Sequence, residues 1–282
     1  MLGLSDTAAA LRETALAGLP VQAGPAGALV VSGFSSEDSD ALLRVWRVAY
    51  ALLTVTGRWP LLVDADIDSK EVEPSPFDAE TKAALAGVDR AARTVDPWPF
   101  FQRSDDEAPD IELPFYTQGF HGIDVTAGVL PKVGPVVSIQ QLLRAAYDHV
   151  LSDPGLTARV LDGTRDVVST DYWYVPDDVS LLLLPSVSPW LAAHWMGFWG
   201  ALEQEQELAA VLWQWHQRWD VRPVACWGTM LQFEVHRPPT PGEDAFTAAR
   251  QLLALSPNVD IHQWELAVAI TSGEAWFAHH RP

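Results

Sequence analysis

Cysteine is almost absent from this sequence, and long apolar runs are missing altogether. Cys226 is the single cysteine among 282 residues, which excludes a disulfide framework and a cysteine-based zinc site. We expect it to be a small buried side chain. No apolar run reaches the ~18 residues that a membrane span requires. The first twenty residues predict an amphipathic helix rather than a signal peptide, because they lack a basic segment followed by an apolar block. We therefore expect a cytoplasmic protein.

Basic residues are also scarce. The chain carries 18 Lys and Arg against 37 Asp and Glu, a formal net charge of −19. Phosphate recognition needs clustered Lys and Arg, so the composition argues against nucleic acid as a partner and, for the same reason, against an anionic membrane surface. A basic protein partner remains open. So does the alternative that the acidic surface only maintains solubility.

Sequence motifs for catalysis, cofactor binding and metal binding are missing. The chain has no HExxH, GxSxG, P-loop or GxGxxG pattern, and its eight histidines follow no metal-ligand spacing. No arrangement of Ser, His and Asp singles out a triad. We expect no cofactor, no metal and no catalytic residue from these patterns, although a metal site assembled only in three dimensions stays open.

One acidic stretch begins like a calcium loop. In DADIDSKEVEPS, residues 64–75, Asp64 and Asp66 occupy alternate positions, but serine stands where such a loop has its Gly and its final Glu. A solvated loop after a strand is the alternative. Asp64 and Asp66 would also suit the carboxyl end of a parallel strand, where α/β proteins bind ligands.

Short apolar strands alternate with helices, which predicts an α/β protein with mixed β-sheets flanked by helices. The strand–helix–strand pattern from 28–33 to 60–64 favours a parallel pair with a right-handed crossover. Two later strands flank Gly228 as a hairpin, and alternation in the second predicts one buried and one wet face. YWYV at 172–175 also predicts a strand. The expected division is an N-terminal β-α-β lobe at 1–98, a Pro-, Gly- and acid-rich linker or long loop at 99–136, and a C-terminal α-β-β-α-β lobe at 137–282.

Helix starts are indicated by pairs with capping-box spacing. The four pairs are Ser35 with Asp38, Ser75 with Asp78, Ser138 with Gln141, and Thr240 with Glu243. Gly57 is expected to end the helix that follows the first pair.

Tryptophan is concentrated in VLWQWHQRWD, residues 211–220, on a helix predicted at 203–219. Trp215 and Trp219 fall on the core face, whereas Trp213 lies ~200° around the helix from Trp215. Trp213 is either covered by the preceding WLAAHWMGFWG segment or is a surface aromatic suited to an interface or to ligand stacking.

The C-terminal third carries a recognisable series of segments. They are LLLLPSVSPWLAAHWMGFWG, then ELAAVLWQWHQRWDVRPVACWGTMLQFEVHRPPTPGEDAFTAARQLLALSPNVD, then ELAVAITSGEAWFAHH. Through the turn at Pro189–Trp190, the strand end at Arg237–Pro239 and the terminal Trp276–Phe277, this part resembles a bacterial family, the domain of unknown function DUF4253. TGRWPLLV at 56–63 resembles an upstream segment of such proteins.

Two departures from the family pattern are visible. The terminal acidic residue of the pattern is replaced around Ala278–His280, and its cysteine is absent, with Ser256 nearby. The resemblance implies a fold and no catalytic motif.

The first functional hypothesis is an acidic protein-binding module, for instance an immunity protein that masks a basic toxin. Its candidate contacts are the 64–73 stretch and SDDEAPDIE at 104–112, which contains Asp105 and Asp106. Opposite charge would speed association and make it salt-sensitive.

The alternative hypothesis is a small-ligand-binding protein or enzyme. Its cleft would be lined by Trp213, His216, Trp227 and His236, since an apolar pocket with a few convergent polar groups is the usual form of such a site. A third interpretation, a subunit of a larger assembly, also stays open.

Overall fold

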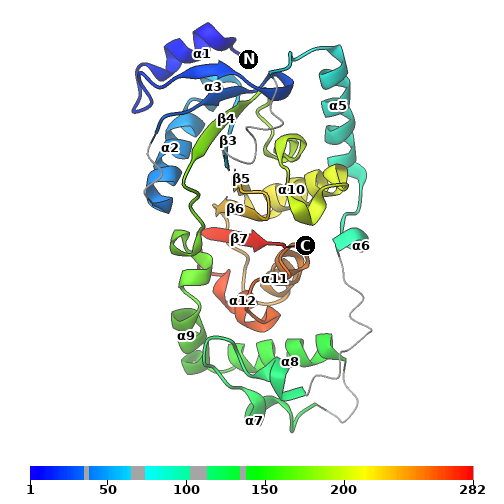
Figure 1. The fold of residues 1–282 in the computed structure, drawn as a ribbon. Helices are drawn as coiled ribbons and strands as arrows, with labels where there is room; N and C mark the ends of the chain where they lie inside the picture. Colours follow the sequence, from blue (N-terminus) through cyan, green and yellow to red (C-terminus); the bar gives the residue numbers. More distant parts are fainter. Residues whose placement is uncertain (35–37, 65–73, 102–112, 134–137, 282) are drawn as a thin grey trace. The chain divides into compact units, whose positions relative to one another are not determined.

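The computed structural model describes residues 1–34, 38–64, 74–101, 113–133 and 138–281 (Figure 1). The strands form a mixed sheet in the order β1-β2-β4-β3-β5-β6-β7, and helices alternate with them along the chain. This confirms the α/β fold class.

Two compact units make up the chain. Unit 1 comprises Met1–Pro97, Trp173–Glu234 and Arg281–Pro282, and unit 2 comprises Trp98–Tyr172 and Val235–His280. The first segment of unit 1 ends at Pro97, one residue before the predicted end of the first lobe. The chain then re-enters unit 1 at Trp173.

Unit 1 contains most of the strands. They are β1 (Val21–Ala23), β2 (Leu29–Val31), β3 (Trp59–Asp64), β4 (Val179–Leu184), β5 (Val221–Cys226) and β6 (Met230–Val235), the last of which ends at the unit boundary. Its helices are α1 (Leu4–Leu11), α2 (Ser39–Ala51), α3 (Leu53–Thr56), α5 (Ala79–Thr94) and α10 (Glu205–Trp219), with 3-10 turns η1 (Pro25–Gly27), η5 (Pro189–Trp195) and η6 (Trp199–Ala201).

Unit 2 is mainly helical. Its helices are α6 (Trp98–Phe101), α7 (Thr126–Val129), α8 (Ile139–Leu151), α9 (Pro154–Gly163), α11 (Glu243–Leu255) and α12 (Gln263–Ala269), with 3-10 turns η2 (Leu113–Thr117), η3 (Asp166–Val168) and η4 (Thr170–Tyr172) and strand β7 (Ala275–His279). Among the described helices of both units, none is long and apolar enough to cross a membrane.

The predicted parallel pairing of the first two apolar strands is wrong. β4 lies between β2 and β3 and pairs antiparallel with both, so that Leu182 is opposite Val30 on one side and Leu61 on the other. β2 and β3 therefore run in the same direction without touching. The parallel neighbour of β3 is β5, with Leu62 opposite Ala225. A strand from much later in the chain took the central place, which the local pattern does not reveal.

The core of unit 1 is built around β3 and β4. Residues 59–63 of β3 are all buried, as expected for an unbroken apolar strand covered on both faces. Trp46 of α2 is fully buried and donates its indole N–H to Pro60 O (2.9 Å), which ties the helix to the strand. Trp59 is also buried and donates to Pro223 O of β5 (3.3 Å).

Helix starts agree with the capping-box pattern at one of the four predicted pairs, and Ser35 of another pair lies outside the described residues. The capping box of Ser138 and Gln141 is present at the start of α8. At α2 and α5, the predicted acceptor is itself the N-cap: Asp38 accepts from Ala41 N and Asp78 from Thr81 N. α11 follows Gly242 rather than Thr240. Aspartate is a good N-cap by itself, so the hydroxyl three residues earlier is not needed.

Two further predictions are corrected, and a third lies partly outside the described residues. The second hairpin strand, β6, has no wet face in its interior, since Gln232 and Glu234 are both buried. Their polar groups are satisfied, because Gln232 donates to Tyr174 O (2.8 Å) and Glu234 accepts from Arg47 (2.7 Å). YWYV forms no strand in the structure. The predicted linker contains α6, η2 and α7, while its residues 102–112 and 134–136 lie outside the described part. The hairpin itself and α10 are confirmed. Gly57 is a left-handed C-cap, but of the short helix α3, because the helix predicted to end there is α2 and ends at Ala51.

Candidate functional site

Trp213, the residue on which the sequence hypothesis depended, is half-buried on α10. α5 and η5 both pack against this helix, in addition to β5. The helix is thus covered on more than one side, which agrees with the first of the two alternatives for Trp213. Its indole nitrogen is buried and has no hydrogen-bond partner among the described residues.

The other residues predicted to line a cleft are distributed over both units. His216 lies 3.4 Å from the carboxylate of Asp220, measured from Nδ1, and its ring centroid is 6.0 Å from that of Trp190. Trp227 is buried in the turn between β5 and β6. His236 is exposed and belongs to unit 2. A shared cleft of these residues stays a prediction.

The predicted acidic contacts lie mostly outside the described residues. Asp66, Asp105 and Asp106 fall there, so the calcium-loop and acidic-contact interpretations remain predictions. Asp64 is described and ends β3, half-buried. Because β3 and β5 are parallel and Val63 is opposite Cys226, the next residues in register are Asp64 and Trp227. Asp64 and Trp227 therefore both lie at the carboxyl ends of these two neighbouring strands.

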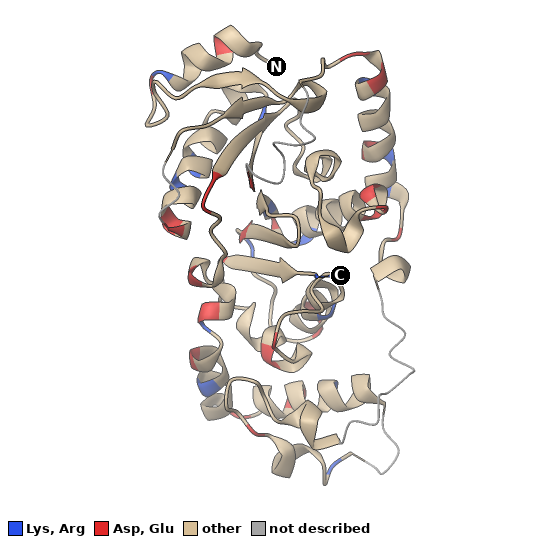
Figure 2. Cartoon of the chain, viewed as in Figure 1, with Lys and Arg blue, Asp and Glu red and all other residues tan. Residues whose placement is uncertain are grey.

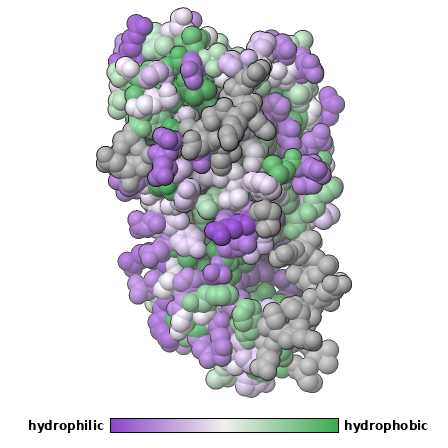
Figure 3. Space-filling view, in the orientation of Figure 1, coloured by the Kyte–Doolittle hydropathy of each residue, from purple (hydrophilic) through white to green (hydrophobic). Residues whose placement is uncertain are grey.

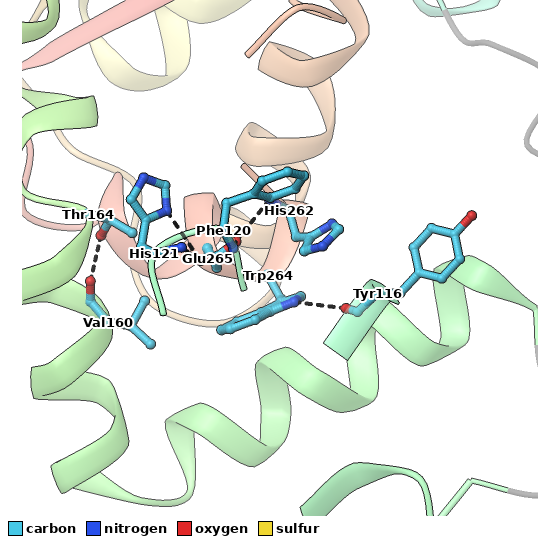
Figure 4. A network of polar contacts seen from close by, with 8 residues as sticks. All are labelled: Tyr116, Phe120, His121, Val160, Thr164, His262, Trp264 and Glu265. Carbon is cyan, nitrogen blue, oxygen red and sulfur yellow. Dashed lines mark hydrogen bonds and ion pairs between the residues drawn. The ribbon is translucent and has the colours of Figure 1, made fainter. Parts of the chain in front are cut away.

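A polar network in unit 2 surrounds the carboxylate of Glu265 (Figure 4). Glu265 is in the first turn of α12 and is fully buried. Its Oε2 accepts from the backbone N–H of His262 and of Phe120, both at 3.1 Å. Its Oε1 accepts from His121 N at 3.2 Å and lies 3.3 Å from His121 Nδ1. One carboxylate thus fixes both its own helix start and a loop about 145 residues earlier.

This network keeps Glu265 ionised. Burial by itself would raise the pKa of Glu265, but hydrogen bonds from His121 and from the backbone N–H groups of His262 and Phe120 outweigh it and lower that pKa below its ordinary value. Burial lowers the pKa of His262, although the neighbouring Glu265 carboxylate opposes this effect. His262 is therefore a neutral ring at pH 7.

The 113–121 loop can approach Glu265 closely because residue 119 is a glycine. A Cβ at Gly119 would lie 2.4 Å from Glu265 Oε1, which is shorter than any real contact, so only glycine fits there without a shift. Trp264, next to Glu265, donates its indole N–H to Tyr116 O at 3.0 Å. The first turn of α12 thus holds the 113–121 loop at three backbone positions, those of Tyr116, Phe120 and His121.

The same loop carries two exposed aromatic rings. Phe115 is 43% exposed and Phe120 is 47% exposed. Their ring centroids are 6.0 Å apart in an edge-to-face arrangement, and the buried His262 ring lies 5.1 Å from Phe115 and 4.7 Å from Phe120. We call Phe115, Phe120 and the supporting His262 the aromatic pair site. It presents apolar rings to solvent on a backbone held by buried hydrogen bonds.

Residues 180–279 match the family model of a domain of unknown function, DUF4253.

This match confirms the resemblance for the C-terminal part of the chain. The DUF4253 segment contains His262, Trp264 and Glu265, the residues that hold the loop, but not the 113–121 loop that carries the rings. The matched range does not include TGRWPLLV at 56–63, so the resemblance of that segment stays a prediction. Searches of curated proteins and of solved structures found no match.

What the arrangement around α12 can do chemically depends on the groups that contact His121 and Glu265. Glu265 and His121 have the geometry of a carboxylate that orients an imidazole, but among the described residues no hydroxyl or thiol is hydrogen-bonded to His121, as a nucleophile would be. The described part of the chain also contains no group of three or more His, Cys, Asp or Glu placed to hold a metal ion.

Sequence reasoning missed this site almost entirely. His121 and His262 were noted only as two of eight scattered histidines. The one local signal is the spacing of His262 and Glu265, which is that of a capping box and is present as such in α12. Nothing in the sequence indicates that Glu265 also binds Phe120 and His121.

Proposed function

We propose that this protein is a binding module for a basic protein and that the aromatic pair site of unit 2 is the centre of its contact surface. The observation that carries the proposal is the combination at Phe115 and Phe120: two half-exposed aromatic rings on a loop that a buried carboxylate holds in place. Such rings expose apolar area to water, which a partner would cover.

Rigidity is the first argument for recognition. Aromatic side chains dominate the binding energy of protein interfaces because they bury a large area at little conformational cost. The hydrogen bonds of Glu265 to Phe120 N and His121 N, and of Trp264 to Tyr116 O, order the loop before a partner arrives. Less entropy is then lost on binding.

Charge is the second argument and indicates the class of partner. Unit 2 contains 7 Lys and Arg against 16 Asp and Glu, a net charge of −9. Figure 2 marks the positions of acidic residues on helices of both units. On the face shown in Figure 3, hydrophobic residues reach the surface among hydrophilic ones. Arg or Lys side chains of a basic partner would be attracted by the field and would pack on the Phe rings as cation–π pairs.

The finer form of the proposal is an immunity protein. A module that masks a basic toxin must bind fast and tightly, and the negative charge of unit 2 together with two ordered aromatic rings favours both properties. This class-level assignment rests on analogy between acidic binding proteins.

Affinity capture from the native host at low salt tests the proposal. The baits are the wild-type chain, the double variant Phe115→Ala/Phe120→Ala and the control Phe100→Ala. The control removes a ring of unit 2 that is more exposed than either of the two and lies on a helix that takes no part in the network. We expect wild type and control to retain the same basic protein. The double variant should lose at least about 100-fold in affinity for it, measured by calorimetry with the purified partner.

Two results would count against the proposal. One is an unchanged affinity of the double variant for the captured protein. The other is a captured partner that is acidic or whose binding does not weaken with salt. If the partner is toxic when expressed alone, co-expression of wild type but not of the double variant should restore growth, which tests the immunity form separately.

A further inference from the structure

An open groove runs along α5 in unit 1, on the side that faces the segment after β4. Its volume is about 360 Å³, within the range of small-molecule sites. The residues that line it are Phe77, Lys82, Leu85, Ala86, Asp89, Arg93, Pro185, Ser186, Ser188 and Leu191. The groove is distinct from the aromatic pair site, which lies in unit 2.

Hydrogen-bond donors predominate among the polar groups of the groove. Arg93 donates from Nε and Nη2 to Asp89 (3.2 and 3.1 Å), which leaves Nη1 without an acceptor among the described residues. Lys82 has no carboxylate within 4 Å in the described part of the chain, and its ammonium lies 5.3 Å from the centre of the Phe77 ring. The Ser188 hydroxyl has no described partner, whereas Ser186 Oγ accepts from Ser188 N (3.0 Å) and keeps its own proton to donate.

The one carboxylate in the lining is already satisfied. Asp89 accepts from Arg93 and from the indole N–H of Trp190 at 2.7 Å. Arg93 in turn stacks on Trp190, with its guanidinium carbon 5.1 Å from the ring centre. This closed set of contacts fixes Arg93 in the groove wall and leaves little acceptor capacity for a ligand donor.

The sign of the charge in the groove opposes that of its surroundings. Two cations and one carboxylate give the lining a net charge of +1, whereas unit 1 contains 11 Lys and Arg against 21 Asp and Glu, a net charge of −10. Phe77, Leu85, Ala86, Pro185 and Leu191 supply apolar surface beside these donors. The complementary molecule has one anionic group and an apolar body.

We propose that this groove binds a small organic carboxylate with an apolar body. The carboxylate accepts hydrogen bonds from Lys82 and from the serine hydroxyls at the β4 end, and the body lies on Leu85, Ala86 and Leu191. Ionic hydrogen bonds give the site its preference for an anion, and burial of the apolar body adds affinity. This site is independent of the proposed recognition of a basic protein.

Titration of the full chain with octanoate, followed by NMR amide shifts, tests this inference. Octylamine and octanol are the cationic and neutral probes of the same length. We expect octanoate to shift amides of α5 and of residues 185–191 with a Kd on the order of 1 mM or tighter, and the other two probes to bind at least about tenfold more weakly. The variant Lys82→Gln should weaken octanoate binding about tenfold.

Arg90→Gln is the matched control, since Arg90 is an exposed cation of the same helix outside the lining. It should leave the octanoate affinity within about twofold of wild type, because distant surface charges are screened. Three results would overturn the inference: no saturable shift with octanoate, equal binding of octylamine or octanol, or equal losses in Lys82→Gln and Arg90→Gln. Phe115→Ala/Phe120→Ala should bind octanoate normally, so failure of either proposal leaves the other standing.

Discussion

In the described part of each unit, a buried charged side chain is hydrogen-bonded to backbone groups from distant parts of the chain. In unit 1 it is Arg58, 4% exposed, whose guanidinium donates to the carbonyls of Leu2 (3.0 Å), Gly27 (3.0 Å) and Leu183 (3.1 Å). In unit 2 it is Glu265, with no exposed surface, whose carboxylate accepts from backbone N–H groups. Both ions hold together segments that are far apart in sequence.

The two buried ions differ in whether their contacts depend on pH. Burial lowers the pKa of Arg58, but a guanidinium remains protonated at any ordinary pH, so the contact in unit 1 depends on geometry alone. The Glu265 carboxylate titrates in the acid range, so the contact in unit 2 also depends on pH. A buried anion and a buried cation can therefore have the same structural role and different vulnerabilities.

The substitution Glu265→Gln should have the largest effect on stability. It keeps the size of the side chain but puts an N–H₂ group where backbone N–H groups already point, so buried donors lose their acceptor. We expect the free energy of unfolding to fall by about 3 kcal/mol, measured by urea denaturation.

The control for this change is Glu274→Gln, which removes an exposed carboxylate of unit 2 and should cost less than about 0.5 kcal/mol. If the two variants lose equal stability, the network around Glu265 contributes nothing beyond its net charge.

The substitution Arg58→Lys should have a smaller effect in unit 1. Lysine keeps the charge, but its single ammonium does not span the three carbonyls that the planar guanidinium reaches. We expect a loss of about 1–2 kcal/mol by the same measurement, because one or two hydrogen bonds are lost. Arg44→Lys on the exposed face of α2 is the control and should be neutral. A neutral Arg58→Lys would show that charge, not geometry, matters at this position.

Mild acid should weaken unit 2 selectively, with the smallest effect of the three. The folded pKa of Glu265 lies below its ordinary 4.5, so its stabilisation is fully present above pH 4.5 and is lost as the pH falls through the folded pKa. The folded pKa of His262 lies below 6.5, so the unfolded chain takes up a proton that the folded chain does not as the pH falls below 6.5. Both effects lower stability in acid.

Urea denaturation followed at NMR signals of each unit checks this comparison between pH 7 and about pH 4. On acidification, the urea midpoint followed at Phe120 and His121 should fall more than the midpoint followed at residues around Arg58. In Glu265→Gln, the midpoint at Phe120 and His121 should depend less on pH below pH 4.5. A uniform response of both units would remove the distinction drawn between the two buried ions.

Local signals predicted much of the secondary structure. The capping box at Ser138, the apolar period of α10 and the turn at Gly228 depend on neighbours a few residues apart, and all three are confirmed. Predictions that needed a distant partner fared worse. Gln232 has the polarity of a solvent-facing strand residue but is buried against Tyr174, which alternation within one strand does not indicate.

The candidate site shows the same limit. The capping spacing of His262 and Glu265 was readable from the sequence, but the hydrogen bonds to Phe120 and His121 join residues 144 and 145 positions apart. The Pro- and Gly-rich composition of the region around Phe115 predicted a long loop and did not indicate which of its rings are exposed.

The sequence by itself determined the α/β class, the acidic character, the helix α10 and the resemblance of the C-terminal part to DUF4253, because composition and short-range periodicity contain that information. Only the tertiary structure decided that β4 separates β2 from β3, that Glu265 holds the 113–121 loop, and that a cationic groove lies along α5. These features depend on contacts between residues that are far apart in the sequence. Composition and short-range periodicity do not indicate which distant residues will be in contact.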